Sequence, residues 1–143
     1  MQIKWGRNAA MPFDYKKEYP ELYMPRIQPG IVNVPKAQYI AVQGAGDPNE
    51  EHGEYADAMQ ILYGISYTIK MSYKGSRMIE GYFEFVVPPL EGLWWMGDGA
   101  AGIDYHRKSD LCWFSIIRMP EFVTPEIFAW AKEEAARKTG IDT

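Results

Sequence analysis

The chain has 143 residues, enough for one domain with a hydrophobic core, and its 19 acidic and 15 basic side chains give a formal net charge of -4. This charge has the wrong sign for a protein that binds nucleic-acid phosphates, so nucleic acid is not an expected partner. With 47% hydrophobic and 24% charged residues, the composition excludes disordered and collagen-like classes. The aromatic content of 15% exceeds what a small core needs, and this surplus is the first indication of function.

The cysteine count and the apolar runs indicate the compartment. Cys112 is the only cysteine, so the chain can form no internal disulfide and a reducing environment is expected. No apolar run approaches the roughly 20 residues that span a bilayer, and residues 1–11 lack the apolar segment of a signal peptide. The sequence therefore predicts a cytoplasmic protein without a membrane partner.

The first quarter of the chain is rich in proline. Five prolines between positions 12 and 35 prevent a long helix, so residues 1–35 are predicted to form an extended N-terminal arm. Residues 36–143 are expected to form a single module. Its first strand is predicted at residues 39–43, where alternation places Ile40 and Val42 on one face.

A helix is predicted after this strand, and its start has two candidates. Asp47 can cap a helix that begins with Pro48, or the first turn begins near Gly53. Beyond either start, apolar residues recur every three or four positions, which predicts an amphipathic helix that ends before Gly75. The stripe consists of Tyr55, Ala58, Leu62, Ile65 and Ile69.

The second half of the chain predicts two more strands and a last helix. Residues 82–87 are predicted to be the second strand, ended by two prolines, and residues 111–117 another strand. Thr124 caps a final helix that ends at Gly140. The order strand, helix, strand, strand and C-terminal helix predicts an α+β fold, with helices packed on one face of a small antiparallel sheet.

Several common catalytic and cofactor motifs are rejected. Residues 97–102 match the letters of the dinucleotide-binding fingerprint, but no helix follows them, so they are interpreted as a mobile connecting loop. His52, His106 and one cysteine are too few for a structural zinc site, and neither a nucleophile elbow nor a phosphate-binding loop occurs. No metal and no cofactor is therefore predicted.

Glu84 is the first candidate for a functional carboxylate, because it interrupts an aromatic and β-branched strand. If its face is exposed, Glu84 is only the polar half of an amphipathic strand. If aromatic side chains surround it, burial would raise its pKa and make it a counter-charge or a proton-transfer group. Adjacent Trp94 and Trp95 cannot both point inward, so one of them is expected on the face away from the helix. The residues expected to form an aromatic ligand site with Glu84 are Tyr82, Trp94, Trp95, Trp113, Tyr55, Met59 and Tyr63.

Five segments carry a resemblance to a known family. They are residues 13–19, 40–50, 58–70, 86–95 and 117–120, and the most specific is the run Pro-Pro-Leu-Glu-Gly-Leu-Trp-Trp within residues 86–95. In these segments the chain resembles the GyrI-like small-molecule-binding family. The resemblance implies a strand-helix-strand-strand module, two copies of which face each other across a groove for lipophilic, often cationic aromatic compounds. Glu84 occupies a place similar to that of a glutamate in the family's second module.

The resemblance and the residues support three hypotheses for the function. The leading one is binding, or sequestration, of flat hydrophobic and often cationic xenobiotics. The second is hydrolysis of the strained cyclopropane in DNA-alkylating natural products, with Tyr67 or Tyr82 polarising the carbonyl and Glu84 acting on water. The third is a protein-interaction module that docks a partner chain through its aromatic residues. Because no second module and no helix-turn-helix region is expected in these 143 residues, a homodimer is predicted to rebuild the groove.

Overall fold

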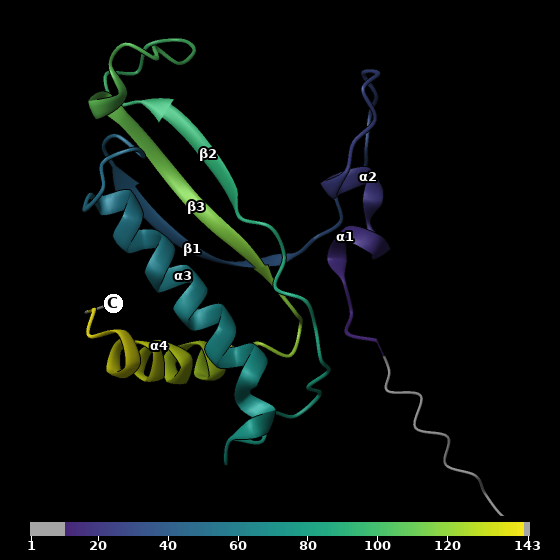
Figure 1. Cartoon of the computed structure of the whole chain (residues 1–143). Helices are drawn as coiled ribbons and strands as arrows, with labels where there is room; N and C mark the ends of the chain where they lie inside the picture. The colour runs from purple at the N-terminus through teal and green to yellow at the C-terminus, as the bar shows by residue number, and fades with distance from the viewer. Residues whose placement is uncertain (1–10, 142–143) are drawn as a thin grey trace, which may run out of the picture.

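The computed structural model describes residues 11–141. Two parts of the sequence interpretation lie outside this range. They are the first ten residues, which belong to the predicted arm and were searched for a signal peptide, and the last two residues of the predicted module. Two single-turn helices and a long connection precede the sheet (Figure 1). The elements are α1 (Tyr15–Glu18), α2 (Pro20–Tyr23), β1 (Gln38–Ala45), α3 (Glu54–Lys70), the 3-10 turn η1 (Met71–Lys74), β2 (Glu91–Met96), the 3-10 turn η2 (Lys108–Asp110), β3 (Leu111–Met119) and α4 (Pro125–Thr139).

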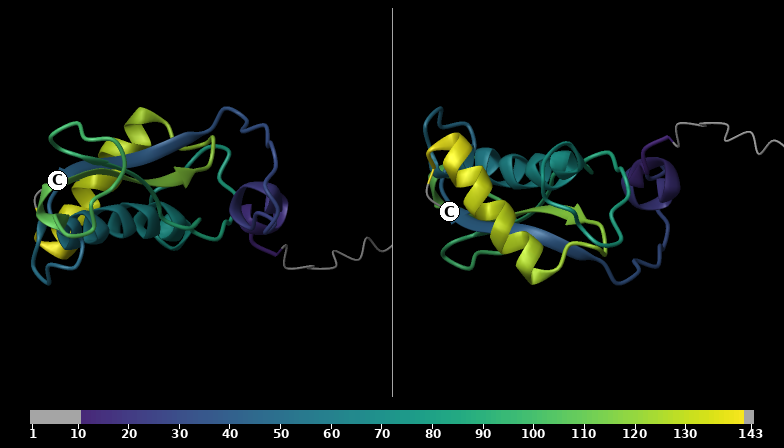
Figure 2. Two further views of the ribbon diagram at one scale, coloured as in Figure 1. Left: turned by 90° about the horizontal axis from the view of Figure 1, so that it is seen from above. Right: turned by 90° about the horizontal axis from the view of Figure 1, so that it is seen from below.

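The three strands form one antiparallel sheet in the order β1-β3-β2. Helices α3 and α4 pack against each other and lie on one side of this sheet, whereas α1 and α2 lie apart from them, past the end of the sheet where β1 begins (Figures 1 and 2). The protein is therefore an α+β fold with helices on one face of a small antiparallel sheet, as the sequence predicts. Among residues 11–141, no helix has both the length and the apolar character needed to cross a bilayer.

Helix α3 begins at the second of its two predicted starts. Gly53 is its N-cap, whereas Asp47 stabilises a separate turn by accepting a hydrogen bond from the Asn49 amide at 2.9 Å. The helix runs to Lys70, and η1 continues it to Lys74, just before Gly75. The predicted stripe faces the sheet, and four of its five members are buried; Tyr55 is half-buried.

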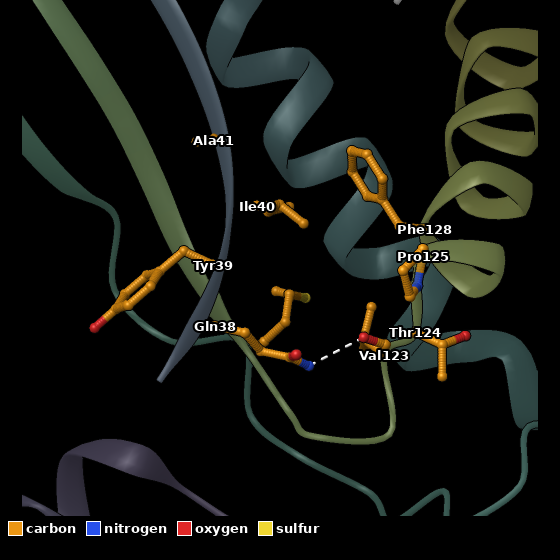
Figure 3. A pocket seen from close by; sticks show the side chains of 9 residues that line it. Gln38, Tyr39, Ile40, Ala41, Val123, Thr124, Pro125 and Phe128 are labelled. Carbon is orange, nitrogen blue, oxygen red and sulfur yellow. Dashed lines mark hydrogen bonds between the residues drawn. The ribbon is translucent and has the colours of Figure 1, made fainter. Parts of the chain in front are cut away.

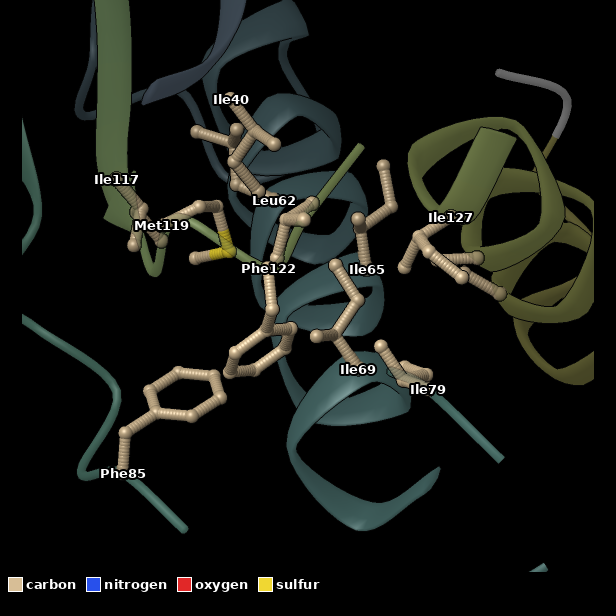
Figure 4. Close-up of a cluster of buried hydrophobic side chains, with 13 residues drawn as sticks. Ile40, Leu62, Ile65, Ile69, Ile79, Phe85, Ile117, Met119, Phe122 and Ile127 are labelled. Carbon is tan, nitrogen blue, oxygen red and sulfur yellow. The ribbon is translucent and has the colours of Figure 1, made fainter. Parts of the chain in front are cut away.

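The core lies between the sheet and the two long helices (Figure 4). β1 contributes Ile40, and β3 contributes Ile117 and Met119, which alternate with residues of the other face. Helix α4 is bounded as predicted: the Thr124 hydroxyl accepts a hydrogen bond from the Ile127 amide at 3.3 Å. Gly140 ends the helix in the left-handed region with φ of 72°.

The prediction of a strand at residues 82–87 was wrong. This segment belongs to the connection between η1 and β2, and only Phe85 forms an isolated parallel bridge, to Phe13. Phe85 is fully buried against the core, so the aromatic alternation anchors the connection instead of forming a ladder. The second strand is β2, which lies after the two prolines because Pro88 and Pro89 cannot donate ladder hydrogen bonds.

Candidate functional site

The sheet has a second face that α3 and α4 do not cover, here called the open face. Because side chains alternate along a strand, it carries Arg118, Ile116 and Phe114 from β3. The register places these side chains beside Tyr39 of β1 and beside Glu91, Leu93 and Trp95 of β2. Leu93 is 60% exposed, and the Trp95 and Phe114 rings lie 5.5 Å apart. The open face is therefore a largely apolar surface with one acidic and one basic residue toward one end.

The arm helices lie over the charged end of the open face. The guanidinium carbon of Arg118 lies 4.7 Å from the ring centre of Tyr15, the first residue of α1, and 4.7 Å from that of Tyr19, the residue after α1. The chain just before α1 is held by two backbone hydrogen bonds of 2.8 Å, from the Phe13 amide to the Glu84 carbonyl and from the Val86 amide to the Phe13 carbonyl. The arm is thus fixed against the body of the protein at two places.

Between the arm and this end of the sheet lies a hollow of about 860 Å³. Its arm wall is made largely of aliphatic and proline side chains between residues 20 and 34. The sheet contributes Tyr39, whose side chain leaves β1 on the side opposite to Ile40 (Figure 3), and Glu91 from the start of β2. Tyr23 of α2 brings a second phenol to the hollow. A mainly apolar space therefore contains two phenols and the Glu91 carboxyl from the sheet, and the arm adds the charged side chains of Glu21 and Arg26.

Glu91 is the most unusual polar group of the hollow. Its Oε2 atom is enclosed and has no hydrogen-bond partner among residues 11–141. Burial raises the pKa of the Glu91 carboxyl above its ordinary value, and the positive charge of Arg118 opposes this shift. A carboxyl with a raised pKa holds its proton to a higher pH than an exposed glutamate does, which suits it to proton transfer or to pairing with a cation.

The two phenols of the hollow remain protonated at neutral pH. Burial raises the pKa of Tyr23, while nearby Arg118 opposes the shift. Burial also raises the pKa of Tyr39, and the Glu91 carboxylate adds to this effect. Both hydroxyl groups can therefore donate a hydrogen bond to an oxygen of a bound molecule, next to a carboxyl that can accept a proton.

Three of the predicted site residues lie together, but on the helix side of the sheet. Tyr55 packs against Trp94 at 5.4 Å and against Trp113 at 5.1 Å between ring centres, and the two indoles are 6.3 Å apart. Trp113 is fully buried and contributes to the interior. Met59, which is half-buried, packs against the main core.

The remaining predicted site residues are dispersed. Glu84 is exposed on the connection that precedes β2, and Tyr63 and Tyr67 are exposed on α3 with their rings 6.5 Å apart. Tyr82 is half-buried, and its hydroxyl donates a hydrogen bond of 2.6 Å to the Lys70 carbonyl. Trp95 alone among the predicted residues projects from the open face, as expected for one of the two adjacent tryptophans.

The sequence interpretation overlooked Glu91, Tyr23, Tyr39 and Arg118. One available signal was the spacing in the Pro-Pro-Leu-Glu-Gly-Leu-Trp-Trp run, where Glu91 precedes Leu93 by two residues and Trp95 by four. In a strand this spacing puts all three on one face. Tyr23 carries no comparable signal, because its position depends on how the proline-rich arm folds back onto the sheet.

A smaller hollow of about 340 Å³ lies on the other side of β1, between this strand and the first turn of α4 (Figure 3). Ile40 and Phe128 line it, and the Gln38 side-chain amide donates a hydrogen bond of 3.0 Å to the Val123 carbonyl beside it. It has no ionisable side chain other than Tyr39. The larger hollow with Glu91 is therefore the candidate functional site.

No protein-family model and no curated protein matches the chain. Solved structures from Listeria innocua do match it. A protein described as a hydrolase has 44% identity and a TM-score of 0.77, and the match covers 90% of this chain and 61% of that one. A second structure of a Listeria innocua hydrolase has 43% identity and a TM-score of 0.82, with 92% and 62% covered.

A third structure, of an uncharacterized conserved protein from Listeria innocua, has 44% identity and a TM-score of 0.81, with 92% and 62% covered. The chain thus spans about three fifths of the length of these proteins. Two of the three similar structures are described as hydrolases, so this chain is similar over nearly its whole length to part of a hydrolase.

Proposed function

We propose that this chain belongs to the GyrI-like proteins and binds flat hydrophobic, often cationic, small molecules on the open face and in the hollow beneath the arm. The observation that carries the proposal is the enclosed, unpartnered Glu91 carboxylate oxygen at the end of an apolar surface. An aromatic cation would stack on Trp95 and Phe114, and its charge would offset the cost of the buried carboxylate. Glu91 thereby takes the role that the sequence interpretation gave to Glu84.

A fluorescence titration with a rhodamine-type dye, a planar organic cation, tests binding. Glu91→Gln is expected to weaken dye affinity about tenfold, because it removes the negative charge and keeps the shape of the side chain. Glu84→Gln is the matched control on an exposed glutamate and is expected to bind like the wild type. Equal affinity of the Glu91→Gln variant and the wild type would remove the proposed site.

Hydrolysis is the second candidate function, and the description of two similar proteins as hydrolases favours it. In a cyclopropane conjugated to a carbonyl, water would attack a ring carbon while a ring carbon–carbon bond breaks. The electron pair of that bond would pass to the carbonyl as an enolate, stabilised by hydrogen bonds from Tyr23 or Tyr39. Glu91 would take the proton from water and return it to the enolate carbon, which completes the addition of one water.

Mass spectrometry of such a substrate after incubation tests this second function. The expected result is a product heavier by one water, formed by the wild type and about 10²-fold more slowly by Glu91→Gln, in line with the usual contribution of a general base. Tyr39→Phe removes a phenol donor and keeps the ring, so it is expected to slow the reaction less. Substrate returned unchanged by the wild type would leave binding as the function.

We further propose that two copies of the chain face each other across their open faces in a cytoplasmic homodimer. Leu93 at 60% exposure and the half-buried Trp95 support this, since a sheet face of this kind is normally covered. Sedimentation over a concentration series is expected to show a dimer. Leu93→Glu would place two like charges in the interface and is expected to shift the population toward monomers, whereas only monomers of the wild type at every concentration would exclude the dimer.

A further inference from the structure

Arg118 is buried without an acidic partner. Only 3% of the residue is exposed, although it carries a charge that is always present at physiological pH. The ion pairs within residues 11–141 involve Arg107 and Arg137, and no carboxylate oxygen of this range lies within 4.0 Å of the Arg118 guanidinium. Because burying a cation is unfavourable without compensation, other groups must stabilise it.

The compensation comes from the arm, where the Tyr23 hydroxyl faces the guanidinium and two further rings lie close to it. Tyr15 and Tyr19 are nearly parallel, with ring planes 19° apart and centres separated by 6.3 Å, and the guanidinium carbon lies 4.7 Å from each. A planar guanidinium can stack on such rings in a way that a lysine ammonium cannot. Tyr15 is itself 2% exposed, so the contact is enclosed and the attraction is weakly screened.

This contact determines where the wall of the hollow lies. Tyr19 is the residue between α1 and α2, and Tyr23 and the aliphatic wall of the hollow follow within the next fifteen residues. We propose that Arg118 is a positioning residue, which clamps the arm onto the sheet so that the hollow closes over Glu91. This inference rests on the function proposed above for the hollow.

Arg118 also acts on the hollow through its charge. Glu91 of β2 faces it, together with Tyr39 of β1 and Tyr23 of α2, and the arm wall adds the charged side chains of Glu21 and Arg26. Without the positive charge, the Glu91 carboxyl would hold its proton to a higher pH. Stacking and charge are separable, because lysine keeps the charge and loses the planar stack, whereas glutamine loses both.

Two measurements on the full chain test the clamp. Trypsin cleavage after Lys17 of α1 reports release of the arm, and a rhodamine-type dye titrated at a series of pH values reports the midpoint of Glu91-dependent binding.

Arg118→Gln is expected to be cleaved at least tenfold faster and to bind dye with a midpoint at higher pH. Arg118→Lys is expected to be cleaved faster with a midpoint close to that of the wild type. Arg77→Gln, which removes an exposed guanidinium 5.3 Å from Trp130, is the control and should behave like the wild type in both.

The outcomes separate the clamp from the proposed function. If Glu91→Gln binds dye as the wild type does, the function fails, and cleavage after Lys17 still decides whether Arg118 holds the arm. If Glu91 matters but Arg118→Gln shows wild-type cleavage and midpoint, the clamp is overturned. Should Arg118→Gln not fold, Tyr19→Leu removes one ring without changing charge. It is expected to speed cleavage and leave the midpoint unchanged, and wild-type cleavage in this variant also overturns the clamp.

Discussion

Trp94 and Trp95 leave β2 on opposite faces. Trp94 lies opposite Trp113 on the helix side, in contact with Tyr55, whereas Trp95 lies opposite Cys112 and packs on Phe114 at the open face. The two neighbouring indoles therefore serve different purposes, one in the interior and one on the candidate binding surface.

Replacing each tryptophan by alanine should separate these roles. Trp94→Ala is expected to lower the free energy of unfolding by about 2–4 kcal/mol, because it leaves a cavity beside Trp113. Trp95→Ala is expected to cost about 1 kcal/mol of stability and to weaken binding of a rhodamine-type dye roughly 5–10-fold, through lost stacking. Urea denaturation and dye fluorescence measure the two effects. The opposite result, with dye affinity lost only in Trp94→Ala, would place the ligand on the helix side.

The elements of the fold were predictable where a local sequence pattern marks the buried face of a helix or one of its ends. The stripe on α3, the cap at Thr124 and the glycine at 140 all lie where the sequence predicts them, because each depends on contacts within a few residues. The strand prediction at residues 82–87 failed because Phe85 is buried although its segment forms only one isolated bridge, to Phe13. Alternation alone cannot distinguish a ladder from an anchored connection.

The candidate site was less predictable, because it depends on contacts between distant segments. Glu84 and Glu91 both lie in aromatic surroundings in the sequence, but only Glu91 belongs to a strand. The choice between them required the position of the second strand. Arg118 gives no sign of its role in the sequence, because its partners Tyr15 and Tyr19 precede it by about a hundred residues and reach it only through the fold of the arm.

Gly44 is required where β1 crosses the Trp113 indole. A Cβ at this position would lie 2.6 Å from Cζ2 of Trp113, which is fully buried and cannot withdraw. Gly44→Ala is therefore expected to destabilise the protein by about 1–3 kcal/mol. Gly30→Ala is the control, since no atom lies within 4 Å of the added methyl group. Urea denaturation of both variants checks this, and equal stability would mean that Trp113 can move aside.

The Thr124 hydroxyl caps α4, the helix that covers the core beside α3. Thr124→Ala removes the acceptor of the Ile127 amide and is expected to lower the free energy of unfolding by about 1 kcal/mol. Thr124→Ser keeps the hydroxyl and should retain most of the stability. If thermal unfolding shows that serine and alanine are equally destabilising, the loss comes from the threonine methyl group and not from the cap.

Glu91 should make the stability of the protein depend on pH in the opposite sense to an ion-paired carboxylate. Burial raises its pKa in the folded state above the ordinary 4.5, so the folded protein binds this proton more tightly than the unfolded chain does. The contribution of Glu91 is fully present below pH 4.5 and is lost as the pH rises through the raised value. Glu91→Gln removes this loss, so the free energy of unfolding of the variant is expected to exceed that of the wild type by about 1 kcal/mol at neutral pH and by less in acid.

Urea denaturation at pH 4 and pH 7.5 measures the difference, with Glu84→Gln as the exposed control. A stability gain that is equal at both pH values would show that the negative charge of Glu91 does not destabilise the folded protein.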